Sequence, residues 1–153
     1  MNQVSVEVAH SKGGRHEKLL RSRSLEFMKK LKLRNAELSV SLVTDRAIRR
    51  LNRTWRQKDK PTDVLSFPAG DAPKGVPGPK LLGDVVISLD TTSRVAKELG
   101  KTIEAELSRY LAHGLLHLLG HDHLKPAEAK RMRKLENTLL GEEGLIPEGV
   151  HGE

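Results

Sequence analysis

The stretch His113-Gly114-Leu115-Leu116-His117-Leu118-Leu119-Gly120-His121-Asp122-His123 decides the architecture of this 153-residue chain. It holds four of the seven histidines and lies in the most apolar part of a polar sequence. In a helix, His113 and His117 are one turn apart and project from the same face. Gly120 follows where such a helix can end, because glycine adopts the left-handed conformation of a C-cap without strain. A chain reversal there would bring His123 back toward the first two rings.

Three converging imidazoles predict a metal site, because a neutral imidazole offers a nitrogen lone pair near neutral pH. Three such ligands leave one position of a tetrahedral zinc open, which is typical of a catalytic site. The chain has no cysteine, so thiolate ligands and disulfides are both excluded. His121 fits the convergence less well, and we interpret it as solvent-facing or as an outer partner of the site. Asp122 has two open interpretations: it orients a ligand or accepts a proton, or it only forms the turn.

The histidine spacing is that of the metzincin protease motif, His-Glu-x-x-His-x-x-Gly-x-x-His, with one difference. The residue after the first histidine is Gly114, where those proteases have the glutamate that acts as general base. Glycine can neither take nor give a proton. The sequence therefore keeps the metal site and disfavours peptidase chemistry by the usual route.

Length and composition indicate one soluble globular domain. The chain is 37% hydrophobic with a mean hydropathy of -0.48, and 153 residues suffice to bury a core. No apolar run reaches the roughly 20 residues of a membrane helix. The N-terminus lacks the basic start and apolar block of a signal peptide, and the absence of cysteine fits a cytoplasmic protein.

The charge is unevenly distributed along the chain. Residues 1–60 carry 16 lysines and arginines against 6 acidic residues, whereas residues 61–153 carry 11 against 14. A basic half favours a polyanionic partner such as nucleic acid, although an ordinary solvated basic surface explains the charge equally well. Aromatic residues make up only 3% of the chain, so an array of stacked bases is not expected, and backbone electrostatics would have to dominate.

The periodicity of apolar residues predicts alternating strands and helices. Strands are expected over residues 4–8, 38–44, 64–68 and 83–89. Helices are expected from His16 to about Lys32, from Thr44 or Asp45 to about Trp55, from Asp90 or Thr91 to Gly100, from Thr102 toward Gly120, and from Pro126 to Gly141. The Gly/Pro-rich segment 69–80 is expected to be a mobile loop.

The histidine stretch, together with two further blocks, resembles the YbeY family of bacterial ribosomal RNA maturation endoribonucleases. One block is Leu51-Asn-Arg-Thr-Trp-Arg-Gln-Lys-Asp-Lys-Pro-Thr-Asp-Val-Leu-Ser-Phe-Pro68, and the other is Leu82-Gly-Asp-Val-Val-Ile-Ser88. The resemblance implies a single α+β domain over residues 1–140, with a small four-stranded mixed sheet packed against about five helices. It places the metal site at the end of a central helix. Residues 141–153 are expected to form a flexible C-terminal tail.

The resemblance also implies the roles of individual residues. His113, His117 and His123 match the zinc ligands of the family, with one Zn²⁺ per chain, and Arg56 matches its functionally important arginine. We expect Arg56 and Asp122 to be the catalytic side chains. Arg56 could bind a phosphate oxygen through its planar guanidinium group. The residues alone also allow an alternative, in which Arg56 is a helix-end arginine in a surface ion pair.

By resemblance, the activity is single-strand-specific, zinc-dependent cleavage of RNA. The family acts in 16S rRNA 3′-end maturation and in ribosome quality control. Expected partners are rRNA, the small ribosomal subunit, one of its proteins and an Era-type GTPase, without a membrane. Two alternatives stay open: a non-catalytic ribosome assembly factor stabilised by zinc and, less favoured because of Gly114, a metallopeptidase.

Overall fold

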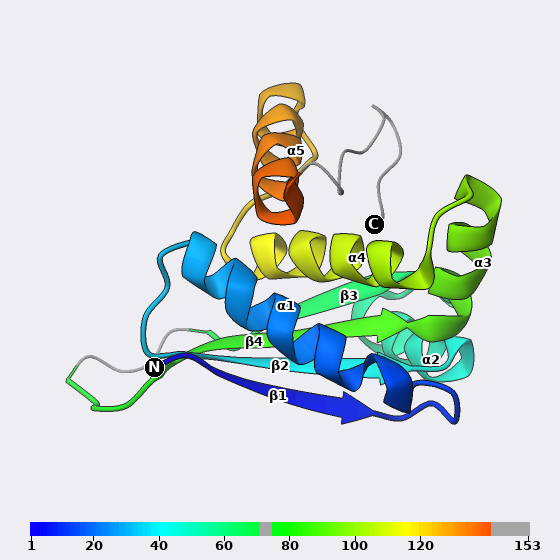
Figure 1. Cartoon of the computed structure of the whole chain (residues 1–153), viewed down its shortest axis with the longest axis horizontal. Coiled ribbons are helices and arrows are strands. Elements are labelled where there is room, and N and C mark those ends of the chain that lie inside the picture. The colour runs from blue at the N-terminus through cyan, green and yellow to red at the C-terminus, as the bar shows by residue number, and fades with distance from the viewer. Residues whose placement is uncertain (71–74, 142–153) are drawn as a thin grey trace.

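The computed structural model describes residues 1–70 and 75–141 of the chain (Figure 1). The elements in order are β1 (Gln3–Val8), a 3-10 turn η1 (Gly14–His16), α1 (Glu17–Lys30), β2 (Ala36–Val43), α2 (Asp45–Arg56), β3 (Val64–Pro68), β4 (Lys80–Ser88), α3 (Leu89–Leu99), α4 (Ile103–Leu118) and α5 (Pro126–Leu140). The predicted α+β fold is confirmed. The middle of the expected loop, 71–74, and almost all of the expected tail, 142–153, lie outside the described residues.

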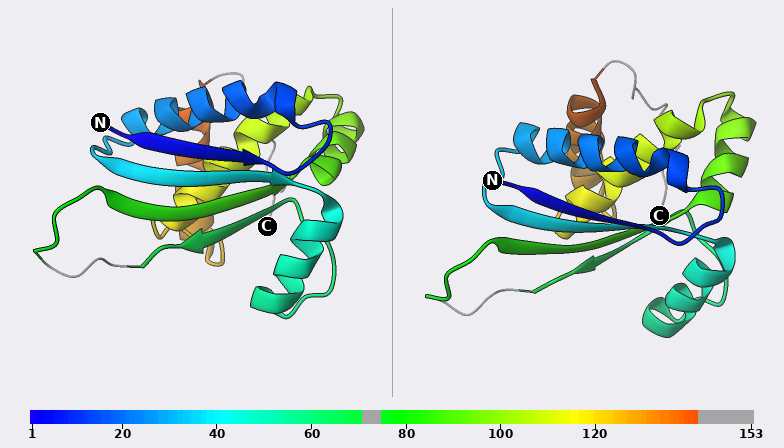
Figure 2. Two further views of the ribbon diagram at one scale, coloured as in Figure 1. Left: turned by 90° about the horizontal axis from the view of Figure 1, so that it is seen from below. Right: turned by 60° about the horizontal axis from the view of Figure 1, so that its bottom comes forward.

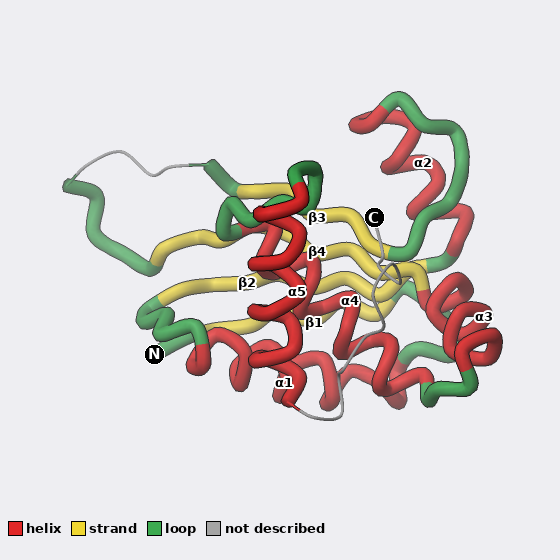
Figure 3. The backbone as a smooth tube through the Cα atoms, turned by 90° about the horizontal axis from the view of Figure 1, so that it is seen from above, coloured by secondary structure: helices red, strands yellow, loops and turns green. Residues whose placement is uncertain are grey.

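The four strands form one mixed sheet in the order β1-β2-β4-β3 (Figure 3). β1 is parallel to β2, with Val6 opposite Val40, and β2 is parallel to β4, with Val40 opposite Val85. β3 is antiparallel to β4 and forms one edge of the sheet. The β-branched strand β4 is therefore central, as its nearly continuous apolar sequence predicts.

Helices cover the two faces of the sheet unequally (Figure 2). α1 and α4 pack on one face over the main core, whose largest buried side chains include Tyr110, Phe27, Leu20 and Met28. α2 lies on the opposite face over a small cluster made of Val43, Ile48, Leu65 and Val86. The outer side of α2 and the edge strand β3 thus stay accessible beside the end of α4.

Three helix ends lie where the sequence predicts them, and one helix start does not. The hydroxyls of Thr44 and Thr102 accept hydrogen bonds from Ala47 and Ala105, and Gly100 closes α3 in the left-handed region with φ 65°. The prediction that α3 begins at Asp90 or Thr91 is wrong, because the helix begins at Leu89 with Ser88 as its N-cap.

The reason for the earlier start of α3 is that Asp90 serves other parts of the fold. Its carboxylate accepts hydrogen bonds from the His10 ring and from the Asp45 backbone N–H, both at 2.8 Å.

The expected start of the fourth strand at Gly83 is also too late. β4 begins at Lys80, which pairs with Ala36 beyond an irregularity in the register.

α4 packs closely against the sheet at Gly114. A Cβ atom on this residue would lie 2.7 Å from Cγ1 of Val85 and 3.1 Å from Oγ of Ser66. The Ser66 hydroxyl donates to the Gly114 carbonyl at 2.9 Å, which ties the helix to the edge strand β3. The helix that carries the first two histidines is therefore held against β3.

Within the described ranges, no helix is long and apolar enough to cross a membrane.

Candidate metal centre

The first two histidines lie on the last two turns of α4. The side chain of His113 is buried with 2% exposure, and His117 is half-buried at the rim. Their Nε2 atoms are 3.1 Å apart. Two nitrogens that bind one tetrahedral zinc at 2.0–2.1 Å are separated by about 3.3 Å, so this spacing suits two ligands of a single ion.

The turn after α4 brings the third histidine to the same place. Gly120 has φ 93°, and hydrogen bonds from the Gly120 and His121 backbone N–H groups to carbonyls of the last helical turn close the reversal. The ring of His123 then lies 5.4 Å from that of His113 and 5.2 Å from that of His117, measured between centroids. The predicted convergence of three imidazoles at the end of the central helix is confirmed.

A buried carboxylate that the sequence analysis missed orients the first histidine. Oε1 of Glu136, on α5, lies 2.8 Å from Nδ1 of His113, and the Glu136 side chain is 1% exposed. A carboxylate at Nδ1 holds the proton on that nitrogen and leaves the Nε2 lone pair directed at the other histidines. One feature of the sequence could have pointed to Glu136: it is an acidic residue four positions after Met132, on the apolar stripe of α5.

The protonation state of His117 suits metal binding. Burial, together with the charges of His113 and His123, lowers the pKa of His117 to about 4. At neutral pH this ring therefore keeps its lone pair. Nδ1 of His123 is buried and makes no hydrogen bond within the described chain; it lies 4.0 Å from Oδ1 of Asp122, so a further ligand would lower the cost of its burial.

The donor set is therefore suited to a cation. The three ligand atoms all lie within 4.8 Å of one another, and the cluster of His113, His117 and His123 could hold a metal ion. All three donors are imidazoles, which carry no negative charge, so these ligands would leave the charge of the ion uncompensated. Such an ion would attract the phosphate oxygens of a substrate.

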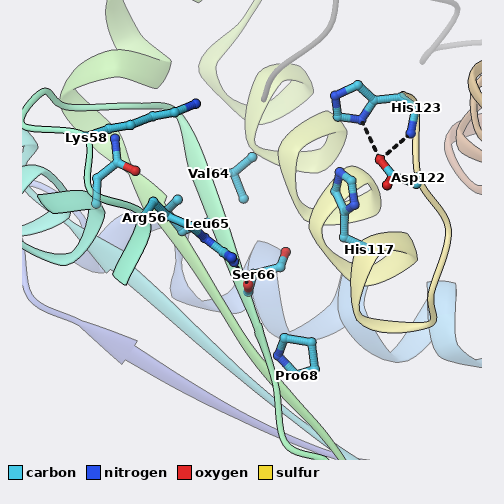
Figure 4. Close-up of a pocket in the computed structure, with 10 residues that line it drawn as sticks. Arg56, Lys58, Val64, Leu65, Ser66, Pro68, His117, Asp122 and His123 are labelled. Carbon is cyan, nitrogen blue, oxygen red and sulfur yellow. Dashed lines mark hydrogen bonds and ion pairs between the residues drawn. The ribbon is translucent and has the colours of Figure 1, made fainter. Parts of the chain in front are cut away.

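An open pocket of about 430 Å³ joins this cluster to α2 and β3. Figure 4 shows Arg56 and Lys58 on the wall opposite His117, Asp122 and His123. The remaining lining residues belong to α2 and β3: Asn52, Val64, Leu65, Ser66 and Pro68. The structure therefore brings the predicted catalytic arginine and the histidine cluster to one pocket.

Two contacts hold the Arg56 guanidinium in place at the C-terminal end of α2. Its Nη2 donates to the Ser66 carbonyl at 2.7 Å, and its Cζ lies 5.4 Å from the centre of the Phe67 ring. The side chain is otherwise exposed and has no acidic partner in the described chain. The alternative of a surface ion pair is therefore not what the structure shows.

The other two polar residues of the histidine stretch have different environments. Oδ1 of Asp122 accepts a hydrogen bond from the backbone N–H of His123 at 2.6 Å, so Asp122 forms the turn and also lines the pocket. His121 is half-buried and does not belong to the cluster of donor atoms. Neither interpretation of Asp122 excludes the other.

The fold and the site together define a class: a mixed-sheet α+β domain with an open three-histidine centre facing an arginine. Comparison with known proteins narrows this class, because the family profile described as Endoribonuclease YbeY matches residues 4–144. The chain belongs to the YbeY family of endoribonucleases.

Curated relatives carry the same description. The chain is 62% identical over 149 residues to the Endoribonuclease YbeY of Myxococcus xanthus, covering 97% of this chain and 51% of that protein. It is 54% identical over 143 residues to the one of Anaeromyxobacter dehalogenans, covering 94% and 72%. The chain thus spans about half the length of the Myxococcus relative.

A solved structure has a similar fold. The solution structure of TM1509 from Thermotoga maritima aligns with a TM-score of 0.59 and 25% identity, covering 97% of this chain and 99% of that one.

Proposed function

We propose that the protein is a zinc-dependent endoribonuclease that cleaves single-stranded RNA. The observation that carries the proposal is that the three-histidine cluster and the Arg56 guanidinium face each other across one pocket. Three imidazoles without a carboxylate or thiolate favour zinc among common metals, with one ion per chain. The names of the relatives support RNA as substrate, since each is described as an endoribonuclease.

Each residue of the pocket has a chemical task in this proposal. His113, His117 and His123 would hold the ion, which when bound supplies Lewis-acid chemistry that polarises a phosphoryl oxygen and makes water more nucleophilic. Arg56 binds a non-bridging oxygen of the scissile phosphate through two N–H groups, which a lysine cannot do in the same way. The Ser66 carbonyl and the Phe67 ring keep the guanidinium oriented for this contact.

We propose that Asp122 acts as the proton acceptor of the reaction. The carboxylate lines the pocket on the same wall as His117 and His123, and its Oδ1 is anchored by the His123 N–H. An anchored carboxylate beside the ligands is placed for proton transfer in the way general bases require. The 2′-hydroxyl of RNA and bulk water are the competing participants in the same step.

The cellular role that we propose is 16S rRNA 3′-end maturation and ribosome quality control in the cytoplasm. The partners would be rRNA and the small ribosomal subunit, with one of its proteins and an Era-type GTPase. The surplus of positive charge in residues 1–60 and the family membership support an rRNA substrate.

A non-catalytic assembly factor is the second candidate. It is favoured by the way the centre joins α4, the following turn and α5 through His113 and Glu136, so that an ion would stabilise the fold. The metallopeptidase alternative is weaker than the sequence alone suggested. A glutamate at position 114 would collide with Val85, so the position lacks both a base and the room for one.

Metal removal and reconstitution test the endoribonuclease. Stripped protein should lose cleavage of a single-stranded RNA oligonucleotide and recover it with zinc. The His117→Ala variant should lose both bound zinc and cleavage, whereas His121→Ala, in the same stretch but outside the cluster, should keep both. Full cleavage by His117→Ala without bound metal would refute the proposal. Rescue of ribosome maturation in cells by His117→Ala would favour the assembly factor.

A further inference from the structure

The outer side of α2 carries a row of arginines that the pocket chemistry does not use. Arg46, Arg49, Arg50 and Arg53 are all exposed and, with Asp59, line a shallow cleft of about 270 Å³. Residues three and four apart on a helix are neighbours on its surface, so these four side chains form one stripe. We call these four residues the arginine stripe.

The arginine stripe runs directly toward the metal centre. Arg56 lies three residues beyond Arg53, in the last turn of the same helix, and it lines the pocket that contains His117 and His123. The inner side of α2, with Ile48 and Leu51, packs on the sheet instead. The stripe therefore lies on the accessible side of the helix and ends at the proposed phosphate-binding residue.

The stripe is positively charged on balance. Asp59 is the only carboxylate that lines the described cleft, and it is paired with Arg49 at 2.9 and 3.3 Å. The hydrogen bond from Arg49, together with the charges of Arg49 and Arg53, lowers the pKa of Asp59. One arginine is thus neutralised, and three remain to attract an anion. Planar guanidinium groups match the geometry of phosphate oxygens.

We propose that the arginine stripe binds successive phosphates of single-stranded RNA and leads the strand into the pocket at Arg56. The inference rests on the endoribonuclease proposal for its substrate. It explains how the protein could bind RNA with few aromatic residues, because the contacts are made to the backbone and are independent of base sequence. The basic residues of α1 are not part of this stripe, because α1 and α2 lie on opposite faces of the sheet (Figure 2).

The salt dependence of binding tests the stripe. Each phosphate contact to a single strand contributes about 0.7 to the slope of log affinity against log salt. The probe is a short fluorescent single-stranded oligodeoxynucleotide, which carries the same phosphates and is followed by anisotropy with the zinc-loaded full chain. The variant Arg46→Gln/Arg50→Gln/Arg53→Gln should bind more weakly, with a slope smaller by about 2.

A matched control removes the same charge elsewhere. Arg15, Lys18 and Lys29 are exposed on or next to α1, and their triple substitution by glutamine should leave the slope unchanged. A stripe variant with the wild-type slope would overturn the proposal, as would an equal loss in the α1 control. All six residues are exposed, and matching circular dichroism melting curves would verify that both variants are folded.

A second measurement, the fluorescence of Trp55, reports whether the bound nucleic-acid strand reaches Arg56. Trp55 is the only tryptophan of the chain, is 63% exposed and precedes Arg56, with its ring edge-on to Phe67 at 6.5 Å. At one probe concentration, its emission should change in the wild type and the α1 control and much less in the stripe variant. Unchanged emission in all three would contradict delivery to Arg56. Binding with the expected slope by a wild-type protein that cleaves no RNA would support the stripe and reject the endoribonuclease.

Discussion

Nδ1 of His113 and Oε1 of Glu136 lie 2.8 Å apart, and both side chains are buried. This contact joins α4 to α5 across 23 positions of sequence. It fixes the tautomer of the most buried imidazole of the cluster, so that its Nε2 lone pair faces the other two rings. The last helix therefore contributes a side chain to the candidate metal centre as well as packing on the core.

Substitution of Glu136 should weaken metal binding. The Glu136→Gln variant keeps the size of the side chain but removes the charge that holds the Nδ1 proton of His113. Loss of such an outer partner typically reduces metal affinity by about 10- to 100-fold. Competition with a chromophoric zinc chelator measures the change. Glu128→Gln, in the first turn of the same helix, is the control, and equal zinc affinity in the Glu136 and Glu128 variants would contradict the role.

A methyl group at position 114 should destabilise the protein. Gly114→Ala places a Cβ 2.7 Å from Cγ1 of the fully buried Val85. Overpacking of this kind costs about 1–3 kcal/mol, and a distance as short as 2.7 Å favours the upper part of that range, above the gain of about 1 kcal/mol from replacing glycine in a helix. The free energy of unfolding should fall, as measured by urea denaturation. In a Val85→Ala background the same substitution should cost clearly less, and an equal loss in both backgrounds would show that the contact with Val85 is not the cause.

Sequence reasoning succeeded where the signal was local. The spacing of His113, His117 and His123 and the glycine at 120 were sufficient to predict the helix, the turn and the convergence of the rings. The caps at Thr44 and Thr102 were also local, because each hydroxyl serves a backbone N–H three residues later.

Features that depend on distant contacts were not predictable in this way. Asp90 was a reasonable cap in sequence, but its carboxylate is engaged by His10 and by Asp45, which lies 45 positions away. The contact between Glu136 and His113 depends on α5 packing against α4, which no local pattern in the sequence indicates. Arg56 was expected at the site by resemblance alone, since nothing local indicates that the end of α2 faces the end of α4.

Acidification should destabilise the metal-free protein. The pKa of His117 falls from 6.5 in an unfolded chain to about 4 in the folded one, and burial also lowers the pKa of His16. Between these values the unfolded state binds more protons, so stability is fully present above pH 6.5 and is lost as the pH falls toward 4.

Urea denaturation of chelator-treated protein at a series of pH values measures this loss. His117→Asn should flatten the pH dependence in that window, and His16→Asn should remove a separate part of it. A metal-free wild type whose stability is constant between pH 6.5 and 4 would contradict the shift.

Replacement of Arg56 by lysine should reduce cleavage while leaving the fold intact. The guanidinium is exposed, and its contacts are one hydrogen bond to the Ser66 carbonyl and the face of Phe67, so stability should change by no more than about 0.5 kcal/mol. A lysine keeps the charge but loses the planar fork. Hydrogen bonds to charged groups contribute about 1.5–3 kcal/mol, so kcat/KM on single-stranded RNA should fall roughly 10- to 100-fold. Arg15→Lys, exposed next to α1 and outside the arginine stripe, should retain wild-type kcat/KM. If Arg56→Lys also retained it, charge alone would suffice at this position, and the proposed two-point grip on the phosphate would be wrong.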